Sequence, residues 1–307
     1  MLRRGQAVTR GERGAEFRSY YDRPVIKPPV WKVPDVPAYL YLGGMAGASS
    51  TMALCADLTG RARLARAGRA AAATGTTASV AALVHDLGRP ARFVNMLRML
   101  KPTSPLSVGS WILAPFSALS AAGAVSDLTG LLPRWGRAAS TTAGVVAPAV
   151  MTYTAVLLAD TAVPGWHEVY RELPYVFAGS AVASGAAVGL LAAPGDEGPA
   201  CRMAVAGVAL EFGAFERMRR RAGMVGEVYE QGRVGAVLRA AKVLNGLGAG
   251  AALFARHSRA AAIAAGACLT AAAVATRYGI FEAGRVSARD PRYTVVPQRQ
   301  RADQVIS

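Results

Sequence analysis

The chain has 307 residues, of which 52% are hydrophobic and 18% charged, and its formal net charge is +16. A basic soluble protein would suggest a nucleic-acid partner. Here the charge falls in short loops and tails between long apolar stretches, so the composition excludes nucleic-acid binding and favours a membrane protein in contact with anionic lipid.

The first element in chain order is a basic, proline-rich tail over residues 1–36, which lacks the apolar run of a cleavable signal peptide. Eight mostly apolar stretches of about 20 residues follow, each long enough to cross a bilayer core of roughly 30 Å. We expect helices at about 37–57, 69–87, 107–127, 138–161, 173–193, 199–217, 234–255 and 259–281. The sequence predicts an all-α membrane protein with eight transmembrane helices in two four-helix bundles, 37–162 and 163–284, followed by a polar, extended tail over 285–307.

The distribution of Lys and Arg predicts the orientation of the chain. An even number of helices places both termini on one side, and most of the basic loop residues fall on that side. The positive-inside rule therefore predicts a multi-pass protein of the cell membrane with both termini cytoplasmic. Arg61, Arg63, Arg66 and Arg69 are exceptions, because they fall on the opposite side.

A short repeat links the ends of two expected helices. Asp57-Leu58-Thr59-Gly60 closes the first helix, and Asp127-Leu128-Thr129-Gly130 closes the third. The repeated unit would be a helical hairpin in the same orientation, although the biased composition offers an alternative explanation.

The metal-binding residue types are sparse. The three cysteines are isolated and show no ligand spacing for zinc or an iron–sulfur cluster. His85, His167 and His257 lie at the ends of expected helices or in loops, where they cannot supply two axial ligands to a haem within the bilayer. We expect no haem, no iron–sulfur cluster and no metal site in this chain.

Polar groups at membrane depth are costly and indicate functional sites by default. His85 and Asp86 close the second expected helix, at the level where Asp35 and Tyr39 begin the first. Tyr153 lies about 12 Å from the inner end of the fourth helix at 1.5 Å per residue. Each has a structural alternative: a helix cap, an interfacial aromatic residue or a packed side chain with one hydrogen bond.

A second polar group occupies the sixth and seventh expected helices. Glu211, Arg239, Lys242 and Asn245 fall one to three turns from the inner surface. Glu211 forms either a structural ion pair with Arg239 or Lys242, or a proton route with Lys242. The polar residues of five helices thus converge on the inner half of the membrane.

Several segments carry a resemblance to a known family. They are Asp86-Leu87-Gly88-Arg89-Pro90, Ser104-Pro105-Leu106-Ser107-Val108-Gly109-Ser110-Trp111, Pro37-Ala38-Tyr39-Leu40-Tyr41-Leu42-Gly43-Gly44, Tyr21-Asp22-Arg23-Pro24-Val25-Ile26-Lys27 and Tyr153-Thr154-Ala155-Val156-Leu157-Leu158. Together they resemble the NrfD-type polysulfide reductase membrane-subunit family over roughly residues 18–282.

The resemblance implies an eight-helix, haem-free subunit of a respiratory oxidoreductase that exchanges electrons between a partner iron–sulfur subunit and membrane quinone. The implied partners are a four-cluster ferredoxin-like protein and a molybdopterin oxidoreductase, and the implied quinone is menaquinone. The chain is then either non-catalytic alone or the quinone-reacting subunit of a larger enzyme. The family name does not fix the terminal substrate.

Quinone reduction takes two electrons and two protons, so a site needs hydrogen-bond donors and a titratable relay. We expect Tyr153 and His85 to bind the quinone carbonyl oxygens. Asp86 would pass protons, with Arg89 holding it charged or oriented, because a nearby cation favours the carboxylate.

Tyr39 would line the quinone pocket and Asp35 would lie at its mouth. Two other function classes stay open. A secondary transporter would show inverted repeats with helices broken at the midplane, and Pro115 and Pro148 lie within expected helices. A purely structural membrane anchor would recruit a soluble enzyme without touching quinone.

Overall fold

The computed structural model describes residues 25–89 and 91–306, and within these residues it contains helices and no strand. The all-α expectation is confirmed. Eight of the described helices have 20 residues or more: α1 (Asp35–Leu58), α2 (Ala62–Asp86), α4 (Pro105–Thr129), α5 (Pro133–Ala159), α7 (Leu173–Ala192), α8 (Glu197–Arg221), α10 (Gly232–Phe254) and α11 (Arg259–Arg289).

Shorter helices lie between and after the long ones: α3 (Ala91–Met96), α6 (Pro164–His167), the 3₁₀ helix η1 (Gly223–Gly226), α9 (Glu227–Glu230) and α12 (Arg292–Ile306). The expectation of an extended tail after residue 285 is wrong. α11 continues to Arg289 because its face still packs there: Gly284 lies against the Trp166 ring, and Ser287 and Ala288 are buried. The residues from Arg292 to Ile306 are helical too. The start of the second helix is also seven residues earlier than expected, at Ala62.

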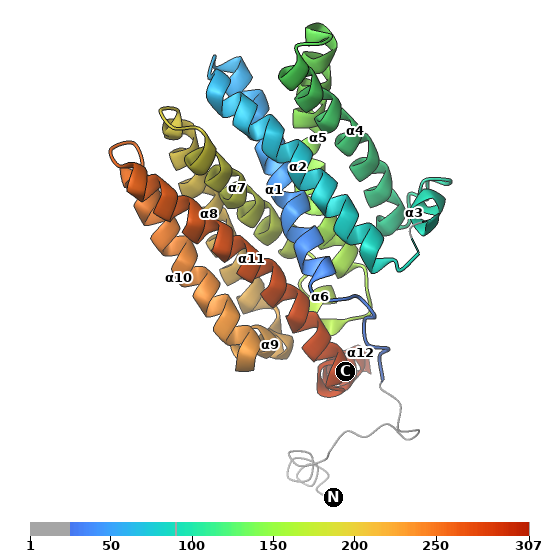
Figure 1. Ribbon diagram of the computed structural model, residues 1–307. Helices are drawn as coiled ribbons and strands as arrows, with labels where there is room; N and C mark the ends of the chain where they lie inside the picture. The colour runs from blue at the N-terminus through green and yellow to red at the C-terminus, as the bar shows by residue number, and fades with distance from the viewer. Residues whose placement is uncertain (1–24, 90, 307) are drawn as a thin grey trace, which may run out of the picture.

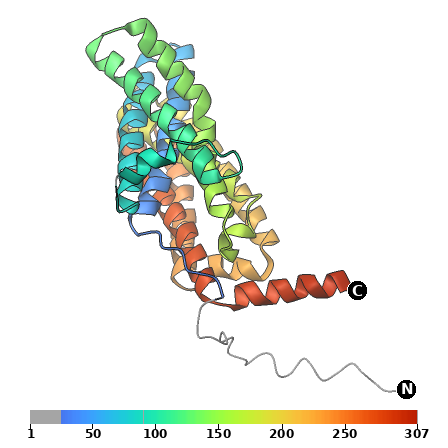
Figure 2. The same ribbon diagram turned by 90° about the vertical axis from the view of Figure 1, so that its right-hand side faces the viewer.

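The long helices run side by side in an elongated bundle (Figure 1). α1 begins and α11 ends at the same end of this bundle, which we call the α6 end, because α6 and α9 also lie there. In the view turned by 90°, α12 leaves this end and runs crosswise to the bundle (Figure 2). The expected tail 1–36 lies largely outside the described residues, and its described part, from residue 25 to Pro34, is not helical.

Five of the described helices are long and apolar enough to cross a membrane by length and composition: α4, α5, α7, α10 and α11. The other three long helices fall short of that hydropathy. α8 carries Arg202, Glu211 and Glu216 within its length, and α1 and α2 are rich in Gly, Ser, Thr or Arg. The expected count of eight crossings therefore stays a prediction.

Small residues allow the closest helix contacts. α7 and α8 meet backbone to backbone: a Cβ added at Gly179 would lie 2.4 Å from the Glu211 nitrogen, and one at Gly207 would lie 2.6 Å from the Ala183 nitrogen. Such small-residue crossings are typical of helices that pack within a membrane. α1 occupies a central place, because it packs against α2, α5, α7 and α11. α1 therefore contacts helices of both expected four-helix bundles.

Candidate functional site

Two phenol groups meet in the interior of the first four long helices. The hydroxyl oxygens of Tyr39, in α1, and Tyr153, in α5, are joined by a hydrogen bond in which either can donate. Tyr39 is 4% exposed and Tyr153 8% exposed, and their rings meet edge to face at 6.5 Å between centroids. The Ser79 hydroxyl of α2 donates to the Tyr39 carbonyl at 3.1 Å, which fixes α2 beside the pair.

A glycine makes room for the Tyr153 ring. A Cβ at Gly109 of α4 would lie 2.6 Å from Cδ2 and 2.7 Å from Cε2 of Tyr153. Carbon atoms in contact lie about 3.5–4.0 Å apart, so no larger residue fits here without displacing the ring. The SPLSVGSW segment singled out in the sequence thus supplies one wall of the phenol pair.

An imidazole–carboxylate pair lies one helical turn from the phenols, toward the α6 end. His85 Nδ1 of α2 lies 2.8 Å from Asp35 Oδ2 of α1. Asp35 precedes Tyr39 by four residues, which is about 6 Å along the helix. The His85 side chain is 75% exposed, whereas that of Asp35 is only 15% exposed. The pair therefore connects the surface with the first turn of α1.

The other two predicted residues of this end take different positions. Asp86 Oδ1 accepts a hydrogen bond from the backbone N–H of Lys32 at 2.9 Å, which ties the segment before α1 to the end of α2. Arg89 is exposed in the following loop, and in the described part of the chain no ion pair joins it to Asp86. The role expected for Arg89 beside Asp86 therefore stays a prediction.

A groove of about 540 Å³ opens beside α4 at its first turn. Leu106, Ser107 and Ser110 of α4 form one wall, and Met96 and Met99, from the segment around α3, contribute apolar surface. Leu106 is one turn from Gly109, the residue that contacts the Tyr153 ring. The groove therefore lies within about one helical turn of the residue that contacts the Tyr153 ring.

The predicted Glu211–Lys242 route is arranged differently from the expectation. Glu211 is buried and accepts a hydrogen bond at 2.7 Å from the Thr276 hydroxyl of α11. Lys242 is exposed, and its ammonium lies 5.1 Å from the centre of the Phe215 ring. The expected contact between Glu211 and Lys242 or Arg239 is not formed among the described ion pairs; Arg239 instead donates to the Glu230 carbonyl at 2.8 Å.

The buried cation near Glu211 is Arg277, which the sequence analysis did not select. Its Nη2 donates to the Phe177 carbonyl at 2.7 Å, and the guanidinium lies 3.8 Å from the centre of the Phe177 ring. Gly44 of α1 makes room for it, since a Cβ there would lie 2.9 Å from Nη2. Apart from Arg259 at its start, Arg277 is the one charged residue of the apolar stretch 259–281, and this position is the sequence signal that points to it.

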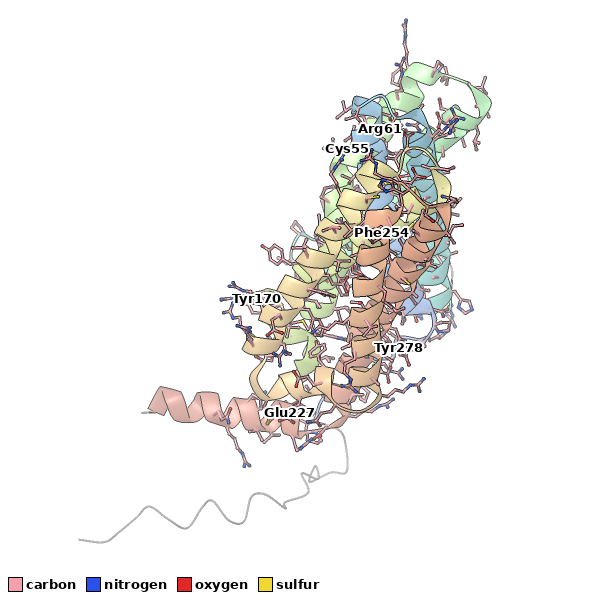
Figure 3. All side chains as sticks on the ribbon, turned by 90° about the vertical axis from the view of Figure 1, so that its left-hand side faces the viewer. Cys55, Arg61, Tyr170, Glu227, Phe254 and Tyr278 are labelled. Atoms are coloured by element: carbon pink, nitrogen blue, oxygen red, sulfur yellow. The ribbon has the colours of Figure 1, made fainter. Side chains whose placement is uncertain are left out.

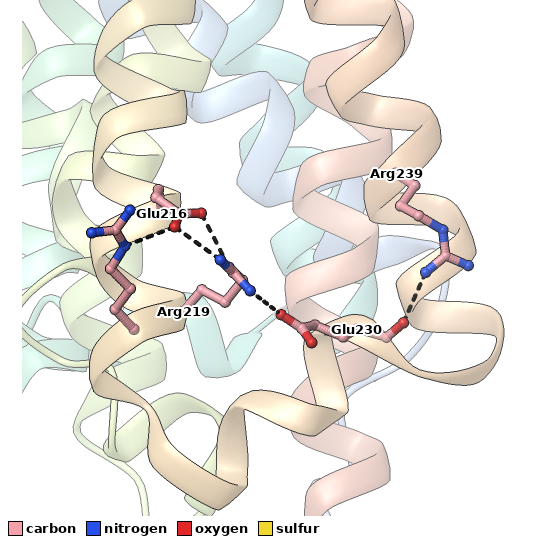
Figure 4. Close-up of polar contacts among 5 residues, drawn as sticks. Glu216, Arg219, Glu230 and Arg239 are labelled. Atoms are coloured by element: carbon pink, nitrogen blue, oxygen red, sulfur yellow. Dashed lines mark hydrogen bonds and ion pairs between the residues drawn. The ribbon is translucent and has the colours of Figure 1, made fainter.

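A charged network closes the turn between α8 and α10 at the α6 end (Figure 4). Arg219 binds Glu216 at 2.9 Å and Glu230 of α9 at 2.9 Å, and Arg220 binds Glu216 at 2.8 Å. Nearby, the Tyr229 hydroxyl donates to the Gly165 carbonyl, and burial raises the pKa of this phenol. These contacts hold the connecting segments at this end in place.

Comparison with known protein families decides the membership of the chain. The profile described as "Polysulphide reductase, NrfD" matches residues 25–194, more than half of the sequence. The chain belongs to the NrfD polysulphide reductase family. No curated protein matches it. The resemblance seen in the sequence is thereby confirmed.

Membership in the NrfD family places the chain among membrane subunits of oxidoreductase complexes, which generally partner iron–sulfur and molybdopterin subunits. Together with the five apolar helices, it makes this a multi-pass membrane protein. The matched region runs from before α1 to the end of α7 and contains the Tyr39–Tyr153 and Asp35–His85 pairs. Glu211 and Arg277 lie beyond it.

Proposed function

We propose that this NrfD-family chain is the quinone-reacting subunit of a respiratory oxidoreductase, which exchanges electrons between a partner iron–sulfur subunit and membrane quinone. The observation that carries the proposal is the buried Tyr39–Tyr153 pair, one turn from the Asp35–His85 pair. These are hydroxyl donors next to a titratable group, and the two phenols are buried among α1, α2, α4 and α5.

The phenol pair leaves one proton free for a ligand. In a bonded pair of hydroxyls, one donates and the other accepts, so the accepting phenol keeps its own O–H for a further acceptor. Tyr153 is the better placed of the two, because its ring faces Gly109 and the α4 wall. We propose that Tyr153 donates to one quinone carbonyl and that Tyr39 orients it.

The Asp35–His85 pair supplies the proton connection. When bound, quinone accepts two electrons and two protons. His85 is exposed to the aqueous end of α2 and paired with the less exposed Asp35, so it can take up a proton from water and hold it one turn from Tyr39. Asp86 lies next to His85 on the surface and assists proton entry.

The groove beside the start of α4 is the proposed entrance. Its leucine and methionine side chains suit a ring with an apolar tail. Leu106, which lines the groove, lies one helical turn from Gly109 on α4. Arg98 and Lys101 at its rim would lie at the membrane surface. Menaquinone is the quinone that the family resemblance favours.

We also propose a membrane topology, partner subunits and a second proton route. Eight helices cross the membrane with both termini cytoplasmic, as the basic loops favour. The partners are a four-cluster ferredoxin-like subunit and a molybdopterin oxidoreductase. Glu211, with Thr276, forms the buried part of a separate proton route, and Lys242 lies on the neighbouring surface.

Tyr153→Phe tests the proposal, because it removes the hydroxyl and keeps the ring. Quinone-linked turnover in native membranes should show a higher KM for quinone, while transfer to a soluble artificial acceptor is unchanged. Tyr278→Phe, on α11, is the matched control (Figure 3). An unaltered KM for quinone in the Tyr153 variant would remove this residue from the site.

A further inference from the structure

A second groove, separate from the phenol pair, lies between α7 and α8. Its volume is about 750 Å³. Its charged residues lie just before α7 and at the end of α8, and its aliphatic residues come from the preceding turns of α8. Tyr170, which lines it, lies on an outer face of the bundle, nearer the Glu227 end than the end that carries Cys55 and Arg61 (Figure 3).

One end of this α7–α8 groove carries an excess of positive charge. Glu172 is 4% exposed, and its Oε1 lies 3.0 Å from Arg221 Nη1 and 3.5 Å from Arg217 Nε. Arg171 donates from Nε to the neutral Tyr170 hydroxyl at 2.8 Å. Three arginines thus face one carboxylate among the lining residues. The excess of two positive charges is complementary to an anion.

The other end of the groove is apolar and hollow. Gly213, Ala214 and Arg217 lie three, four and seven residues after Leu210, so the four residues share one face of α8. Leu210 and Tyr175 are exposed, and a Cβ added at Gly213 would meet nothing within 4 Å. Leu210 lies about 10 Å along the helix from Arg217. The groove therefore changes from cationic to apolar over about that distance.

We propose that the α7–α8 groove binds one anionic phospholipid, with its phosphate at Arg217 and Arg171 and an acyl chain along Leu210 and Gly213. Charge complementarity favours this occupant, because a phosphodiester gains an ionic attraction to the excess arginines, whereas a neutral quinone would gain only hydrogen bonds. A water-soluble peptide would have to bury its backbone beside Leu210, on a helix packed along the candidate membrane span α7. Aromatic side chains such as Tyr170 and Tyr175 are typical of the headgroup level.

Two substitutions test the two halves of the groove without disturbing the core. Arg217→Gln removes one excess charge and leaves Glu172 paired with Arg221. Gly213→Leu fills the apolar half, and nothing lies within 4 Å of the added Cβ. Gly246→Leu, on α10, is the matched control, because its added Cβ also meets nothing within 4 Å.

The measurement is native mass spectrometry of the full chain in detergent, titrated with phosphatidylglycerol, phosphatidylcholine or inorganic phosphate. The wild type and Gly246→Leu should retain one phosphatidylglycerol. Gly213→Leu should lose it, and Arg217→Gln should bind it about fivefold more weakly, as expected for one basic residue near a lipid surface.

Three results would overturn the proposal. One is equal retention of phosphatidylcholine, which would remove the role of charge. Another is undiminished phosphatidylglycerol binding in Gly213→Leu, which would place the lipid elsewhere. The third is full displacement of the lipid by inorganic phosphate, which would show that the groove binds an anion but holds no acyl chain.

Discussion

Gly109→Ala tests whether the position of the Tyr153 ring matters for function. The added methyl group would lie 2.6 Å from the Cδ2 atom of Tyr153, about 1 Å closer than carbon atoms normally approach. The ring is buried and hydrogen-bonded to Tyr39, so it cannot move freely. Overpacking of this kind costs about 1–3 kcal/mol. The better helix propensity of Ala returns about 1 kcal/mol.

The expected outcome is a net loss of about 0–2 kcal/mol in the free energy of unfolding and a larger effect on quinone binding. A ring displaced by about 1 Å weakens the hydrogen bond that we assign to the quinone carbonyl. Loss of one such bond costs about 0.5–1.5 kcal/mol, which raises the KM for quinone about 2- to 13-fold.

The assay compares quinone-linked turnover with transfer to an artificial acceptor in the same membranes, and measures thermal unfolding in detergent. Gly246→Ala is the control, because its added Cβ meets nothing within 4 Å; it should be as stable as the wild type or more stable, with an unchanged KM. If Gly109→Ala lowers stability while the KM for quinone stays at the wild-type value, the reasoning that links this ring to the quinone is refuted.

Three further predictions concern other parts of the chain. Arg69 binds Asp57 at 2.6 Å and Asp127 at 2.9 Å. Arg69→Ala should therefore lower the free energy of unfolding by roughly 1 kcal/mol, and by less at high salt. Arg137→Ala should change the free energy of unfolding little, and equal losses in the two variants would contradict a specific bridge. Burial raises the pKa of the Tyr229 phenol in the folded state above its value of about 10 in the unfolded chain. As pH rises past 10, the unfolded chain loses this proton before the folded chain does, so the free energy of unfolding should fall. Tyr229→Phe should weaken this fall, and an unchanged alkaline slope in unfolding experiments would rule the phenol out. Glu211→Gln should keep the Thr276 hydrogen bond and the fold but slow proton-coupled turnover, and full turnover with unchanged proton uptake would exclude a proton role for Glu211.

The helix directions predicted from the sequence were enough to show that some residues lie at the same level of the bundle. Asp35 and His85 were expected at one level because one begins an outward helix and the other ends an inward helix, and the structure brings them within 2.8 Å. The depth of Tyr153 was also inferred from residue spacing. Depth alone could not show that its hydroxyl meets that of Tyr39, because this depends on the rotation of α1 and α5 about their axes.

Other features depended on packing that hydropathy does not report. The extension of α11 to Arg289 follows from contacts with Trp166, far away in the sequence. The repeated Asp57 and Asp127 segments hinted at equivalent hairpins, but only the structure shows that Arg69 joins both carboxylates. The position of Arg277 in an otherwise apolar stretch is visible in the sequence, but only the structure shows that its guanidinium packs on the Phe177 ring and donates to the Phe177 carbonyl.

Photo-crosslinking tests the central proposal most directly. A photoreactive quinone analogue would be bound to the enzyme in native membranes, and the labelled peptides would be mapped by mass spectrometry. The account predicts competable labelling of residues around Tyr39, Gly109 and Tyr153. Labelling confined to α7, α8, α10 and α11 would contradict the phenol pair as the quinone site.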